Sequence, residues 1–153
     1  MNAIARLAAA AALALPGVAQ AAEWDALIVE HVIEAPYEDV LEDLRLTIEG
    51  RGFVIDAVSH VGAMLNRTAG DVGAQRQVYD HAEVTQFCSA TLSRKVMEAD
   101  ARNLAFCPYG IFTYQLHGEA GRVHVGYRRM PDGPMQEIEA LLDSIVRETV
   151  GLD

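Results

Sequence analysis

The sequence is short of cysteine and of positive charge. It has two cysteines, and 12 lysine and arginine residues against 22 aspartate and glutamate residues, giving a formal net charge of −10 at pH 7. Such an acidic surface repels the phosphates of nucleic acids and the headgroups of anionic lipids. The composition therefore excludes nucleic-acid binding, and it favours a basic surface on any protein partner.

Several motifs of catalysis and metal binding are also absent. The chain has no Cys-x-x-Cys, His-x-His or His-Glu-x-x-His spacing, no glycine-rich phosphate loop and no nucleophile elbow. Without Cys-x-x-Cys-His, covalent c-type haem is excluded. These absences favour a binding or accessory protein and make an enzyme the less favoured interpretation.

The one long apolar run lies at the N-terminus. Arg6 precedes a stretch of alanine and leucine over residues 7–15, which is too short to span a bilayer. Small residues at the −3 and −1 positions predict cleavage after Ala21. We therefore expect a signal peptide over residues 1–21 and one exported domain over residues 22–153, periplasmic if the source is bacterial, with no membrane span after cleavage.

The remaining chain alternates between strand and helix patterns. Residues that are β-branched, aromatic or alternately apolar predict five strands, at 27–34, 53–59, 84–88, 109–116 and 122–129. Apolar residues at helical spacing predict helices between Pro36 and Gly50, at 90–99 and at 135–150, with a short helical turn at 61–65 and a loop at 68–77. The order β-α-β-loop-β-α-β-β-α predicts an α+β fold, a mostly antiparallel sheet packed with helices.

Three segments together carry a family resemblance. They are APYEDVLEDLRLTIEGRGFVI at 35–55, FCSATLSRKVMEADARN at 87–103, and FCPYGIFTYQL at 106–116 followed by VHVGY at 123–127. In these segments the chain resembles the bacterial family called domain of unknown function 302, from about residue 24 to residue 127. The resemblance implies an α+β fold and frequent dimers, so a homodimer is expected, but it implies no activity. Many members resemble Cys-Asn-Pro and Pro-Cys at the two cysteines, whereas this chain has Cys-Ser-Ala and Cys-Pro.

Cys88 and Cys107 flank the helix predicted at 90–99. If they end and begin neighbouring strands, their Cα atoms come within disulfide distance. A bridge closing about 20 residues would stabilise the fold by about 3 kcal/mol on the chain-entropy model. Three interpretations stay open: a structural disulfide or buried inert thiols, a redox-active or ligand-binding thiol pair, and a metal or cofactor site.

Soft donors elsewhere in the chain extend the third interpretation. His60 and Met64 are four residues apart, and Met97 lies between the cysteines. A set of Cys88, Cys107 and His60 would suit copper, and histidine with methionine would suit a non-covalent haem iron. The competing interpretation makes both methionines core residues and His60 a surface histidine.

Further ligand-binding candidates surround the predicted 90–99 helix. Ser89 is expected to cap its N-terminus, Arg94 follows on the helix, and Tyr109 begins the next strand. The helix N-terminus would suit an anion, although a cap, a solvated basic face and cross-strand aromatic packing explain the same residues. His31 and His124 alternate with apolar neighbours and are expected to face solvent.

Together these observations predict a small exported binding or accessory protein. Its site is expected where Cys88 and Cys107 meet, bounded by His60 and the 90–99 helix, and would serve periplasmic sulfur or electron-transfer chemistry with a redox protein as partner. The alternative is a structural or interaction module with a plain disulfide and no cofactor.

Overall fold

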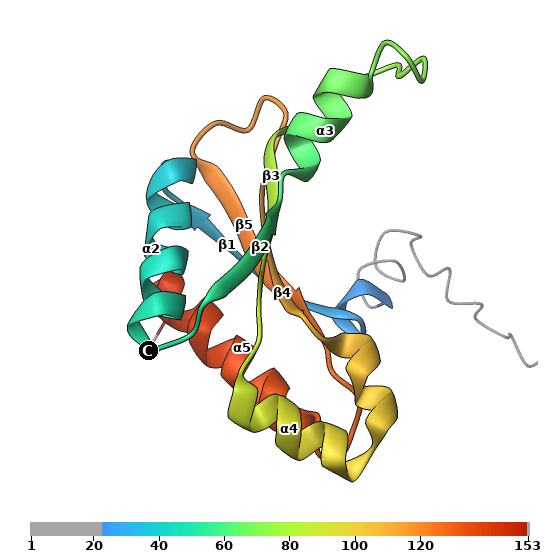
Figure 1. The fold of residues 1–153 in the computed structure, drawn as a ribbon. Helices are drawn as coiled ribbons and strands as arrows, with labels where there is room; N and C mark the ends of the chain where they lie inside the picture. Colours follow the sequence, from blue (N-terminus) through green and yellow to red (C-terminus); the bar gives the residue numbers. More distant parts are fainter. Residues whose placement is uncertain (1–22, 153) are drawn as a thin grey trace, which may run out of the picture.

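A five-stranded antiparallel sheet is the framework of the protein (Figure 1). The computed structural model describes residues 23–152, so the predicted signal peptide lies outside the described residues. The strands run in the order β1-β5-β4-β3-β2, which places β1 and β2 at the edges. Their bounds are Ile28–Glu34 for β1, Ile55–Ser59 for β2, Tyr79–Phe87 for β3, Tyr109–Leu116 for β4 and Arg122–Arg128 for β5.

Two long helices cover one face of this sheet. They are α2, Tyr37–Gly50, and α5, Gln136–Thr149, which pack against each other and against the central strands. The connection from β3 to β4 contains α4, Ala90–Ala99, and the 3₁₀ helix η1, Ala101–Phe106. The connection from β2 to β3 contains α3, Val61–Thr68, which projects away from the body of the domain (Figure 1). The predicted α+β fold is confirmed.

Local sequence explains where α2 begins and ends. Pro36 precedes its first turn in an extended conformation, and Glu38 and Asp39 place negative charge at the positive end of the helix. After the helix the chain turns at Gly52, whose φ of 81° lies in the left-handed region that favours glycine. The apolar stripe of α2 is buried at Val40, Leu44 and Ile48.

Alternate residues of the central strands divide between the two faces of the sheet. Tyr109 and Ile111 of β4, and Val123, Val125 and Tyr127 of β5, are at most 1 % exposed and form the core with α2 and α5. The residues between them point to the opposite face because successive side chains of a strand alternate. We call this opposite side the open face.

Several expected boundaries differ from the structure. Strand β3 begins at Tyr79, not at residue 84, because its polar first half is held by pairing with β4. Helix α3 extends to Thr68, and η1 was not predicted. Residues 23–152 contain no helix long and apolar enough to cross a membrane.

The expectation that His124 faces solvent is wrong. It points to the open face, as its alternation predicts, but it is only 8 % exposed because β5 lies between β1 and β4 and the Tyr114 ring stacks on it. His31, on the edge strand, is partly buried, and its Nε2 is enclosed without a hydrogen-bond partner.

We predict that Gly126→Ala destabilises the fold. Gly126 lies beneath the Phe112 ring, and a Cβ at this position would come within 2.5 Å of that ring and closer still to the Val29 carbonyl oxygen. We expect the free energy of unfolding in urea to fall by about 1–3 kcal/mol. The control is Gly50→Ala at the end of α2, where a Cβ meets no atom within 4 Å and the change should stabilise by about 0.5–1 kcal/mol. Equal effects of the two changes would contradict the packing described for Phe112.

Candidate functional site

The structure brings Cys88 and Cys107 together at one end of the sheet. Phe87 at the end of β3 pairs with Tyr109 at the start of β4. Cys88 directly follows Phe87, and Cys107 lies two residues before Tyr109, so the two strands carry the cysteines past the same edge. Both are free thiols and partly buried. We call them the cysteine pair.

The surroundings of Cys88 favour its neutral form. Burial, followed by the adjoining Cys107 side chain, raises the pKa of the Cys88 thiol to about 12. The backbone N–H of Tyr109 acts in the opposite direction by donating to Cys88, but it does not outweigh these effects. Cys88 is therefore a thiol, not a thiolate, at neutral pH, and is a poor nucleophile there.

Three of the predicted ligand-binding residues have partners within the protein. The Tyr109 hydroxyl lies 2.9 Å from the Ser93 hydroxyl of α4, and both groups are buried. Ser89 caps α4, since its Oγ accepts a hydrogen bond from the Leu92 N–H at 3.3 Å. Arg94 is exposed and lies 3.5 Å from Glu98 on the same helix. The N-terminus of α4 is thus satisfied by its own cap, as the sequence predicts.

The remaining candidates lie apart from the cysteine pair or pack into the core. His60 precedes α3, and its Nδ1 lies 2.6 Å from Glu83. Glu83 comes five residues before Cys88, which at the rise of a strand is about 17 Å along the chain. Met64 is 42 % exposed on α3, which contradicts a core position, whereas Met97 packs against the core. Within residues 23–152 no group of three or more His, Cys, Asp or Glu side chains is placed to hold a metal ion. The structure does not bring His60 to the cysteines.

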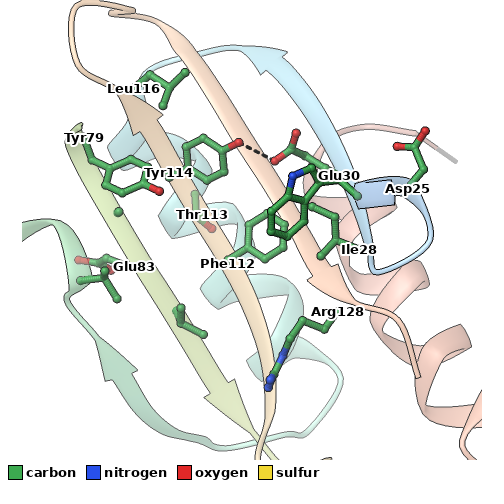
Figure 2. A pocket seen from close by; sticks show the side chains of 14 residues that line it. Asp25, Ile28, Glu30, Tyr79, Glu83, Phe112, Thr113, Tyr114, Leu116 and Arg128 are labelled. Atoms are coloured by element: carbon green, nitrogen blue, oxygen red, sulfur yellow. Dashed lines mark hydrogen bonds between the residues drawn. The ribbon is translucent and has the colours of Figure 1, made fainter. Parts of the chain in front are cut away.

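A second candidate site lies on the open face of the sheet. It is a groove of about 740 Å³, lined mainly by apolar and aromatic residues of β1, β3 and β4, by α3 and by the segment before β1 (Figure 2). Its main side chains are Trp24, Ile28, Glu30, Tyr79, Val84, Phe112, Tyr114, Leu116 and Arg128. We call it the open-face groove.

Glu30, Tyr114 and His124 form a contact cluster at the side of this groove. The Tyr114 hydroxyl donates to Glu30 Oε1 at 2.7 Å, and burial together with this hydrogen bond raises the pKa of Tyr114. The Tyr114 and His124 rings stack with centroids 4.3 Å apart. Glu30 Oε2 lies 3.3 Å from His124 Nδ1, yet neither ring nitrogen has a hydrogen-bond partner among the described residues. The cluster fixes the Glu30 carboxylate beside the aromatic rings.

The sequence interpretation did not identify the open-face groove. Its residues come from four strands, from α3 and from the segment before β1, and no short motif joins them. One signal was present. Strand β4 carries aromatic residues on both of its faces, Tyr109 toward the core and Phe112 and Tyr114 on the other side. A strand that is apolar on both faces indicates a second surface that is not simply solvated.

Comparisons with known proteins identify the family. The family described as "Domain of unknown function DUF302" matches residues 29–145, which include the cysteine pair and most of the open-face groove. The chain belongs to the DUF302 family. This confirms the resemblance found in the three sequence segments.

A solved DUF302 structure shares the fold. It is the crystal structure of an uncharacterized conserved protein DUF302 from Bacillus stearothermophilus, with 15% sequence identity and a TM-score of 0.62. The similarity covers 82% of this chain and 96% of that chain. At this identity the likeness shows the fold alone. A search of curated proteins gave no match.

We predict that Cys107→Ala lowers the pKa of Cys88. The change removes the hydrogen bond and the electrostatic effect of the Cys107 thiol, which help to raise the pKa of Cys88, and leaves burial as the main cause. Alkylation of Cys88 by iodoacetamide, followed by peptide mass spectrometry from pH 7 to pH 12, should be slow at pH 8 in the reduced parent protein and faster in the variant. Ser93→Ala, which also shortens a buried side chain nearby, is the control and should leave the midpoint of the profile in place.

The same shift gives the sign of a pH effect on stability. Because folding raises the pKa of Cys88 from its ordinary 9.0 to about 12, its contribution to stability is full below pH 9 and is lost as the pH rises toward 12. A reduced protein whose stability rises over this interval would contradict the assignment.

Proposed function

We propose that this DUF302 protein is an exported accessory protein whose cysteine pair passes between dithiol and disulfide in exchange with a redox protein. The observation that carries the proposal is the contact between Cys88 and Cys107, in which the Cys107 side chain adjoins the Cys88 thiol and helps to raise the pKa of Cys88. Both side chains are partly exposed and therefore accessible to a partner. The predicted signal peptide supports export to an oxidising compartment, where a thiol pair of this kind is readily oxidised.

The exchange is a two-electron reaction with a partner disulfide. One cysteine, deprotonated as it reacts, attacks a partner sulfur and forms a mixed disulfide, releasing the partner's first thiolate. The second cysteine then loses its proton and attacks the mixed disulfide at the sulfur of the first, forming Cys88–Cys107 and releasing the partner's second thiolate. The cysteine pair loses two electrons and two protons, and the partner is reduced to a dithiol.

The raised pKa of Cys88 assigns a direction to this exchange. A strongly oxidising disulfide depends on a reduced state that is stabilised as a thiolate, and burial denies Cys88 that stabilisation. The disulfide is therefore the favoured form. When reduced, the protein therefore acts as a donor of reducing equivalents and not as a strong oxidant. Cys88 is suited to the second, intramolecular step, in which proximity compensates for its small thiolate fraction.

A static disulfide is the second candidate, and the surroundings of α4 favour it. Between the two cysteines, α4 is attached to the rest of the domain by the buried Ser93–Tyr109 contact and by an ion pair of 2.5 Å between Lys95 and Glu137. A bridge would fasten both ends of this connection to β3 and β4. In this case the protein would be an interaction module, and the bridge would stabilise the fold without turning over.

We predict that full chain purified without reductant contains a Cys88–Cys107 bridge. The denatured mass should be about 2 Da below that of the reduced chain, and the thermal midpoint should exceed that of the reduced protein by about 10 °C, as expected for about 3 kcal/mol in a domain of this size. Cys88→Ser and Cys107→Ser should each abolish the difference between oxidising and reducing conditions. Two free thiols after aerobic purification would contradict the proposal.

Equilibration with glutathione of defined potential separates the two candidates. A pair that cycles should reach equilibrium within hours, with a potential below about −230 mV. A bridge that resists reduction in the folded protein and reopens only on unfolding supports the static disulfide instead.

A further inference from the structure

The open-face groove has the size and the lining of a small-molecule site. Its volume of about 740 Å³ falls within the roughly 300–1,000 Å³ of pockets that bind drug-sized ligands. Ile28, Val84, Phe112 and Leu116 contribute apolar surface from strands β1, β3 and β4. Helices α2 and α5 pack on the opposite face, so within residues 23–152 they leave this surface uncovered.

Aromatic rings lie side by side in the groove. The Phe112 and Tyr114 centroids are 6.1 Å apart with planes inclined by 30°, and Tyr79 meets Tyr114 edge-on at 5.5 Å. Trp24 lines the same groove and is 55 % exposed. The face of an aromatic ring carries negative potential and attracts cations, most strongly when water is excluded. The rings thus favour a ligand that combines apolar surface with positive charge.

The placement of charges points to the same ligand class. Figure 2 shows the Glu30 carboxylate beside the rings, joined to the Tyr114 hydroxyl, while Arg128 lies at the end of the groove away from Leu116. A carboxylate accepts up to about four hydrogen bonds, so Glu30 retains acceptor capacity beyond Tyr114. Glu83, also at the groove, is engaged by His60 at 2.6 Å. The net charge of −10 adds a field that attracts cations.

We propose that the open-face groove binds an organic cation, an ammonium group carried on an aromatic or alkyl body. The charged group lies between the Glu30 carboxylate and the faces of the aromatic rings, and the body lies along Phe112 and Val84. Glu30 already has the Tyr114 hydroxyl at 2.7 Å and His124 Nδ1 at 3.3 Å, and its remaining acceptor capacity faces the groove, where an anion would be repelled by the carboxylate and by the negative ring faces. This site is separate from the cysteine pair and does not depend on its redox state.

A single tryptophan makes the site directly observable. Trp24 is the one tryptophan of the chain, so its fluorescence reports on the groove alone. Full chain is titrated with phenyltrimethylammonium, with tert-butylbenzene, in which carbon replaces the charged nitrogen, and with benzenesulfonate. We expect the cation to bind about 10-fold more tightly than its neutral isostere, and the anion to give no saturable change.

Matched charge changes test where the cation lies. Glu30→Gln should weaken binding of phenyltrimethylammonium by about 3- to 10-fold. Arg128→Gln should strengthen it by about 2-fold, since a like charge at the end of the groove is removed. The control is Asp43→Asn on the exposed side of α2, which changes the net charge equally and should leave the affinity unchanged. Arg128→Gln keeps the test valid if Glu30→Gln fails to fold, because the two predictions have opposite signs.

Three results would overturn the proposal. One is equal affinity for the cation and tert-butylbenzene, which would make the groove a simple apolar site. Another is equal weakening by Glu30→Gln and Asp43→Asn, which would reduce the effect to overall charge. The third is a dimer in sedimentation that shields Trp24 and admits none of the probes, which would make the groove an interface between two copies. Cys88→Ser should retain cation binding, so the cation proposal can be tested even if the redox proposal fails.

Discussion

The structure depends on a sheet that is covered by helices on one face only. Helices α2 and α5 bury the residues of one parity in β4 and β5, and this contact supplies the core. The residues that point to the open face are not covered by these helices, yet many of them are apolar or aromatic. Their exposure is limited instead by contacts within the sheet surface, where Phe112 lies over Gly126 and Tyr114 lies over His124. The apolar character of the open face therefore has a local cause in cross-strand packing.

Strand β4 connects the two candidate sites. Its first residue, Tyr109, anchors the end of the sheet beside the cysteine pair, through its hydroxyl contact with Ser93 and its backbone N–H directed at Cys88. Farther along, Phe112 and Tyr114 form the floor of the open-face groove. The two sites thus lie at different positions along one rigid element, the cysteine pair just before its first residue and the groove along its open face. Such an arrangement suits a protein that presents one surface to a partner and another to a ligand.

The sequence predicted features with a local cause and missed those that arise from pairing. Ser89 as a helix cap and β4 as a strand follow from adjacent residues, and both are confirmed. The early start of β3 at Tyr79 depends on hydrogen bonds from β4, which no local pattern reveals. His60 was expected beside the cysteines, but β2 pairs with β3 so that His60 contacts Glu83 in the middle of β3. The burial of His124 likewise comes from a neighbouring strand.

Because side chains of β4 alternate between the two faces of the sheet, the residues that build the core differ from those that line the groove. Substitutions at Tyr109 or Ile111 act on the core, whereas substitutions at Phe112 or Tyr114 act on the open face and leave the contacts with α2 and α5 in place. Side chains that line the groove can therefore change while the core contacts with α2 and α5 remain, at the cost only of the packing that Phe112 and Tyr114 make over Gly126 and His124. A change of ligand preference in this domain therefore requires no change of its architecture.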